Sequence, residues 1–105
     1  MFGRSPQSAI EQVQAADWEA WVEDNDAVIV DVRRQMEWAL ARIPNSVSIP
    51  MANLYFSFDD LDKDRPILVV CRTGARSQRA ARILKRNGFN VANLRRGMRS
   101  IGFRV

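Results

Sequence analysis

The chain has 105 residues, of which 47% are hydrophobic and 27% are charged; this composition is typical of a single globular domain spanning residues 1–105. One cysteine and no histidine exclude an internal disulfide and a cysteine-rich zinc site, so we expect no metal and no cofactor. No stretch approaches the ~20 apolar residues that cross a membrane. Because residues 1–19 also lack the apolar run of a signal peptide, we expect a cytoplasmic protein with no membrane partner.

The charge is divided unevenly along the chain. Residues 1–65 hold all the acidic residues and carry a net charge of −6, whereas residues 66–105 hold no acidic residue and carry +10. A field of this sign concentrates anions near the second part, although a basic surface without special purpose has the same composition. The arginines lack interleaved aromatic residues and form no nucleic-acid motif, so we expect no nucleic-acid partner.

Two short helices are predicted at the start of the chain, over residues 8–15 and 17–22. Asp17 is placed to cap the second helix. The spacing of its apolar residues predicts one helix face that packs in the core, made of Trp18, Trp21 and Val22.

The middle of the chain alternates strand and helix patterns. Residues 27–32 form a nearly continuous β-branched run, which is typical of a strand covered on both faces. Residues 36–41 favour a short helix, and residues 46–50 alternate as a short strand that ends at a proline. Residues 51–61 favour a loose helical segment.

The second half of the chain repeats this alternation. Residues 66–71 and 90–94 are apolar runs that predict strands. The clearest helix lies between them over residues 77–88, with a buried apolar face, basic residues in its last turn and Gly88 just past its end. The alternation predicts an α/β fold in three layers, with helices flanking a mainly parallel sheet of about five strands.

The cysteine, Cys71, lies where a predicted strand ends and a loop leads into the predicted helix. A helix N-terminus offers unpaired backbone amides to an anion, and Gly74 permits the tight turn that aims them at one point. Arg72 and Arg76 add positive charge. Together these groups favour the thiolate, which is the nucleophilic form, so no neighbouring base is needed.

The loop has two other interpretations. A cysteine at the end of a strand is often an inert, buried apolar residue, but two arginines and a glycine are poor surroundings for one. Tyrosine phosphatases have a related loop with five residues between cysteine and arginine, whereas four separate Cys71 from Arg76. The shorter loop fits a sulfur atom better than a phosphate group.

Four separated motifs resemble the rhodanese family, in the family's order and spacing. The first two are VIVDVRRQMEW, with Asp-Val-Arg at the end of a strand, and ARIPNSVSIP. The third is PILVVCRTGARSQRAARILKRNGF, which holds the cysteine loop, and the fourth is NLRRGM. The likeness extends over about residues 27–97, and its six-residue loop resembles the sulfurtransferase type.

The resemblance implies a thiosulfate sulfurtransferase. Cys71 would attack the outer sulfur of thiosulfate, release sulfite, become a persulfide and pass its sulfur to cyanide or a thiol acceptor, including a thiol-bearing protein. Arg72 and Arg76 would attract and orient the anion. The remaining substrate-binding positions would contribute backbone amides, a helix cap or a further donor: Thr73, Gly74, Ala75 and Ser77. Asp31 and Arg33 are expected to be structural, with Arg33 paired to Glu37 or else facing the pocket.

The sequence departs from the family pattern in several places. Arg42 replaces a usual histidine, and Asn45 and Arg96 replace usual glycines. A tryptophan that usually follows is absent from residues 98–103, which predicts a more open pocket.

The sequence is also compatible with three other functions. A sulfur carrier or docking module would form the same persulfide but serve one protein partner. A phosphatase or arsenate reductase would use the cysteine on another anion. A redox sensor would have its thiolate oxidised by peroxide.

Overall fold

The computed structural model describes residues 9–105 and contains a five-stranded sheet. All neighbouring strands are parallel, in the order β1-β5-β4-β2-β3. The strands are β1 (Glu11–Val13), β2 (Val28–Asp31), β3 (Val47–Ser48), β4 (Ile67–Val70) and β5 (Val91–Leu94). The predicted α/β class with a parallel sheet is therefore confirmed.

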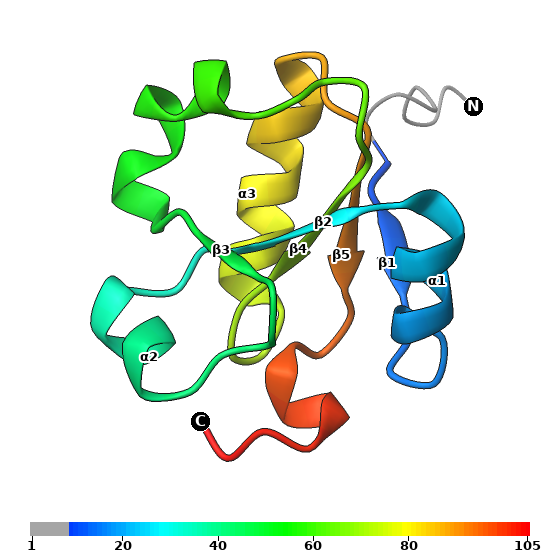
Figure 1. Cartoon of the computed structure of the whole chain (residues 1–105), viewed down its shortest axis with the longest axis vertical. Helices are drawn as coiled ribbons and strands as arrows, with labels where there is room; N and C mark the ends of the chain where they lie inside the picture. Colours follow the sequence, from blue (N-terminus) through cyan, green and yellow to red (C-terminus); the bar gives the residue numbers. More distant parts are fainter. Residues whose placement is uncertain (1–8) are drawn as a thin grey trace, which may run out of the picture.

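Helices connect the strands and cover both faces of the sheet (Figure 1). The α-helices are α1 (Trp18–Asn25), α2 (Gln35–Leu40) and α3 (Ala75–Arg86), and the 3₁₀ helices are η2 (Met51–Phe56), η3 (Phe58–Asp60) and η4 (Met98–Ile101). The predicted segment 51–61 is thus two 3₁₀ helices. Within residues 9–105, no helix is long and apolar enough to cross a membrane.

The central strand β4 is buried at all four positions. Ile67 and Val69 belong to the core formed with α3, η2 and η3. Leu68 and Val70 belong to the core on the other face, formed with α1 and the C-terminal segment. A strand covered on both faces must be apolar at every position, which explains its continuous apolar run. The predicted aromatic face of α1 packs half-buried against this second core.

The prediction of a helix over residues 8–15 is wrong. Residues 11–13 form β1, which pairs in parallel with β5 so that Gln12 lies opposite Asn93; Ser8 lies outside the described residues. The segment is too short to show a strand pattern, and its conformation is decided by pairing with a distant strand.

Helix α3 starts two residues before the predicted position. Gly74 is its N-cap, with φ 99°, so the helix begins at Ala75 and includes Ser77. Its predicted C-terminal end is confirmed. Gly88 follows the C-cap with φ 93°, its amide donates to Lys85 O at 3.1 Å, and the next amide returns to Leu84 O at 3.2 Å. This is the Schellman pattern that satisfies the last carbonyls of a helix.

Candidate active site

Cys71 lies at the carboxyl end of β4, directly before the loop that leads into α3. Its side chain is 1% exposed. The loop turns at Gly74, whose φ of 99° lies in the left-handed region. A Cβ atom there would lie 3.0 Å from the backbone nitrogen of Arg96. Glycine is therefore favoured both by the backbone conformation and by the close approach of the chain after β5.

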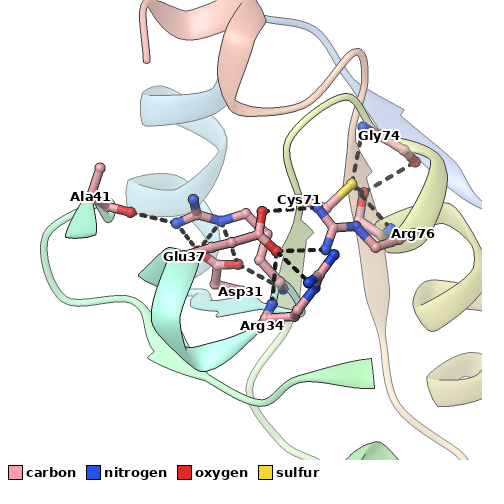
Figure 2. A network of polar contacts seen from close by, with 9 residues as sticks. Asp31, Arg34, Glu37, Ala41, Cys71, Gly74 and Arg76 are labelled. Atoms are coloured by element: carbon pink, nitrogen blue, oxygen red, sulfur yellow. Dashed lines mark hydrogen bonds and ion pairs between the residues drawn. The ribbon is translucent and has the colours of Figure 1, made fainter. Parts of the chain in front are cut away.

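Two backbone amides and one hydroxyl group surround the sulfur of Cys71. The backbone amides of Gly74 and Ser77 lie 3.0 Å and 3.3 Å from Sγ, and the Ser77 hydroxyl lies 3.3 Å from it. Figure 2 shows the sulfur facing the turn at Gly74. Backbone amides from the first turn of a helix stabilise negative charge on the sulfur.

The amides that reach Sγ come from two of the predicted substrate-binding positions. One belongs to Gly74 and the other to Ser77, which lies inside the first turn of α3 and does not cap the helix. The early start of α3 turns this amide inward.

Arg33 does not pair with Glu37, and it does not face the pocket. Its side chain is 1% exposed and pairs with the buried carboxylate of Asp31, with 2.8 Å between Nη2 and Oδ2. It also donates to the carbonyl oxygen of Ala41. This pair ties the end of β2 to the segment after α2 (Figure 2). The structural role predicted for both residues agrees with this arrangement, and the predicted partner of Arg33 is corrected.

Glu37 pairs with Arg76 instead, a contact that the sequence analysis missed. Arg76 Nη1 lies 2.9 Å from Oε1 and Nη2 lies 3.3 Å from Oε2. The hydrogen bond from Arg76 lowers the pKa of Glu37 from 4.5 to about 2, and the carboxylate raises the pKa of Arg76. Both groups are therefore charged at neutral pH, and much of the positive charge of Arg76 is compensated. The sequence around the Asp-Val-Arg motif does not indicate which arginine Glu37 contacts.

A pocket of about 480 Å³ opens beside the loop, between α2, η2 and the start of α3. Its lining includes four charged side chains, Arg34, Glu37, Arg72 and Arg76. Arg72 is exposed and has no carboxylate within ion-pair distance among residues 9–105. The mouth of this pocket is therefore positively charged, with Arg72 as the uncompensated cation nearest the cysteine in sequence.

The segment after β5 supports the loop from the other side. The amides of Met98 and Arg99 donate to the carbonyl oxygens of Cys71 and Arg72, at 2.9 Å and 3.1 Å. A Cβ atom on Gly97 would lie 2.5 Å from the backbone of Arg72. Glycine is thus required at this position of the NLRRGM motif, and η4 covers the loop although a tryptophan is absent from residues 98–103.

Arg96 and Asn45 replace family glycines but keep the glycine-like backbone. Their φ angles are 65° and 68°. Asparagine tolerates the left-handed region well, whereas arginine is less favoured there. Arg96 lines two further hollows beside the loop, together with Arg99 in one and Arg95 in the other.

A buried polar side chain from β5 also reaches the site. Asn93 is 3% exposed and accepts a hydrogen bond from the Ser77 hydroxyl at 2.5 Å. Sequence reasoning treated residues 90–94 only as a strand. A polar residue inside an apolar run was the signal that could have identified it, because buried polar groups require partners.

A profile of the rhodanese-like domain matches residues 14–102. The chain belongs to the rhodanese-like family. A sulfurtransferase of Allochromatium vinosum is 36% identical over 74 residues, which cover 70% of this chain and 69% of that protein. The thiosulfate sulfurtransferase GlpE of Coxiella burnetii is 38% identical over 78 residues, covering 72% and 73%. A rhodanese-like domain protein of Staphylococcus aureus superposes with a TM-score of 0.82 at 28% identity, covering 90% and 94%. The rhodanese resemblance of the four motifs is confirmed.

Proposed function

We propose that the protein is a sulfurtransferase that takes the outer sulfur of thiosulfate onto Cys71 and passes it to cyanide or a thiol. The observation that carries the proposal is the cradle around Cys71, in which the amides of Gly74 and Ser77 lie within 3.3 Å of the sulfur. The names of the sulfurtransferase relatives support the same reaction class. Arg72, exposed beside the pocket, supplies the charge that attracts an anion.

The reaction proceeds in two displacements. The thiolate of Cys71 attacks the outer sulfur, the sulfur–sulfur bond of thiosulfate breaks, and sulfite leaves with the electron pair. The resulting persulfide is anionic, so amides and Arg72 near the loop stabilise its terminal sulfur. A cyanide ion or thiolate then attacks that sulfur and restores the Cys71 thiolate. These two successive displacements give ping-pong kinetics.

A phosphatase reaction is less well supported by the charges at the site. A phosphatase needs an acid that protonates the leaving oxygen. Among the described residues that line the pocket, Glu37 is the only carboxylic acid, and its pKa of about 2 keeps it ionised at neutral pH. Asp31 is fully buried and paired with Arg33. Glu37 therefore cannot act as that acid at neutral pH, and Asp31 is held away from the pocket by its pairing with Arg33.

Intact-mass measurement tests the proposal directly. Thiosulfate is expected to add the mass of one sulfur atom to the protein, and cyanide or a thiol is expected to remove it. Cys71→Ser should abolish both the adduct and turnover, and Ser57→Ala, a change at a distant hydroxyl, should leave both intact. A Cys71→Ser protein that still transfers sulfur would refute the nucleophile.

The same assay separates turnover from a carrier role. Arg95 and Arg96 add exposed cations beside the loop, which a protein partner with an acidic surface could contact. If a cysteine desulfurase loads Cys71 rapidly and thiosulfate loads it only slowly, the protein is a sulfur carrier. Rapid turnover with thiosulfate at modest concentration supports the enzyme.

A further inference from the structure

A line of hydrogen bonds runs from the sulfur of Cys71 to the edge of the sheet. Cys71 Sγ lies 3.3 Å from Ser77 Oγ, which lies 2.5 Å from Asn93 Oδ1. Asn93 Nδ2 donates to Gln12 Oε1 at 3.0 Å, and Gln12 Nε2 donates to the carbonyl oxygen of Ile10 at 3.2 Å. Ser77 and Asn93 are 0% and 3% exposed, so their hydrogen bonds are shielded from solvent.

The carbonyl group of Ile10 determines which side chain donates in each of these hydrogen bonds. A backbone carbonyl can only accept, so Gln12 turns its NH₂ group to Ile10 and its oxygen to Asn93. Gln12 Nε2 also donates to Gln78 Oε1 at 2.6 Å, which favours the same orientation. Asn93 must then donate its NH₂ group to Gln12 and present its oxygen to Ser77.

The Ser77 hydroxyl has one hydrogen and several acceptors around it. The Asn93 oxygen is the nearest, at 2.5 Å, and the carbonyl oxygen of Gly74 lies at 3.2 Å. With its hydrogen directed to Asn93, the hydroxyl can only accept a hydrogen bond from the Cys71 thiol. That contact is available to the protonated sulfur and is lost when the sulfur ionises.

We propose that Asn93 is a positioning residue, which holds the Ser77 hydrogen away from Cys71 and so favours the thiol in the resting protein. Ionisation of the sulfur turns this hydrogen toward Sγ and leaves the buried Asn93 oxygen without its donor. Asn93 therefore opposes the amides of Gly74 and Ser77, which favour the thiolate. The balance makes the resting sulfur less open to alkylation and oxidation than a free thiolate.

Charged groups around the sulfur stay constant in the test below, because every substitution replaces a neutral side chain by another. These groups are Arg72 and Arg76 from the loop and α3, Arg34 and Glu37 from the start of α2, Asp31 and Arg33 from the end of β2, and Arg95, Arg96 and Arg99 after β5. A change in thiolate formation among the variants therefore reports hydrogen bonding.

The pH dependence of alkylation by iodoacetamide tests the proposal, because Cys71 is the only cysteine. In Asn93→Leu the Ser77 hydrogen is free to bond the thiolate, and we expect the midpoint of the pH–rate profile to fall by about one pH unit. In Gln12→Ala the Asn93 amide can turn around and donate to Ser77, which forces the hydroxyl hydrogen toward the sulfur. We expect the midpoint to fall here too.

Matched variants show whether the effect passes through the hydroxyl. Gln14→Ala, a change at an exposed glutamine of the same segment, should leave the midpoint unchanged. In a Ser77→Ala background neither Asn93→Leu nor Gln12→Ala should move it. Gln12 is exposed, so Gln12→Ala remains a usable test even if Asn93→Leu does not fold. A midpoint in Gln12→Ala that is unchanged or higher overturns the proposal. The proposal is also overturned if Asn93→Leu or Gln12→Ala lowers the midpoint as much in the Ser77→Ala background as in the native protein. The assay uses no sulfur donor or acceptor, so its result is independent of the proposed sulfur transfer.

Discussion

The electrostatic role of Arg76 in the structure differs from the one that its place in the motif predicts. The sequence places it five positions after Cys71 as a second anion-binding cation. In the structure its guanidinium is engaged by both carboxylate oxygens of Glu37. It therefore links the active loop, residues 71–76, to α2. Arg72 is left as the exposed cation of the loop. We infer that Arg76 mainly holds the loop in place and that Arg72 meets the incoming anion.

The Glu37–Arg76 pair predicts a specific loss of stability in acid. Arg76 lowers the pKa of Glu37 from 4.5 to about 2 in the folded protein, so the folded state favours the ionised form. This stabilisation is fully present above pH 4.5 and is lost as the pH falls through about 2. We expect the free energy of unfolding to fall more steeply over this range in the native protein than in Glu37→Gln, measured by urea denaturation.

Glu23→Gln provides the comparison for this prediction. Glu23 is exposed on α1 and has no cationic partner within ion-pair distance among residues 9–105. Its replacement should leave the acid profile of the native protein nearly unchanged. Parallel profiles for the native protein and Glu37→Gln would show that the ion pair adds nothing to stability.

At the scale of elements, the active loop is held between two neighbours. The first turn of α3 directs amides inward, and η4 satisfies the outward carbonyls of Cys71 and Arg72. Gly97 makes this approach possible, since its backbone lies against that of Arg72. The loop is therefore supported by a segment about 25 residues further along the chain.

Gly97→Ala is expected to displace η4 from the loop. The new Cβ would lie 2.5 Å from backbone atoms of Arg72, at a φ of 68°, and neither backbone can yield without breaking hydrogen bonds. We expect a destabilisation of about 3 kcal/mol or more, together with loss of sulfur transfer. Thermal and urea denaturation measure the first effect, and thiosulfate turnover measures the second.

Gly102→Ala separates the clash from the backbone strain. Gly102 also has a positive φ, 98°, but nothing lies within 4 Å of its Cβ position. Its replacement should cost only about 1 kcal/mol and preserve activity. Equal losses in the two variants would mean that the contact between Gly97 and the loop has no special importance.

At the scale of the whole molecule, the excess of basic residues is confined to the second part of the chain, which holds Cys71. Residues 66–105 carry a net charge of +10, and several of these arginines lie around the active loop. Because such a field is screened by salt, we expect kcat/KM for thiosulfate to fall several-fold as the ionic strength rises from ~0.01 to ~0.5 M. Initial rates at constant pH measure this dependence, and a flat profile would show that the field does not assist binding.

Two arginine substitutions distinguish the general field from a local contact. Arg72→Ala and Arg82→Ala each remove one charge, but Arg82 is exposed on α3 and lines none of the pockets beside the loop. We expect the first to lower kcat/KM by about tenfold or more, as loss of a charged hydrogen bond does. The second should change it less than about twofold. Similar effects would contradict direct contact between Arg72 and the anion.

The sequence by itself determined the elements whose signal is local. The apolar run of β4, the cap at Gly88 and the spacing of the cysteine loop each follow from neighbouring residues, because burial on both faces, a left-handed turn and a helix N-terminus have local sequence requirements. These features were enough to predict the α/β class, the family resemblance and the candidate nucleophile.

Only the tertiary structure decided which distant groups meet. β1 becomes a strand through pairing with β5, Glu37 reaches Arg76 across 39 positions, and Asn93 reaches Ser77 across 16. Such contacts depend on the order of strands and on where each helix begins, which no short stretch of sequence encodes. The candidate nucleophile could therefore be proposed from the sequence, whereas the hydrogen bonds and charges around it required the fold.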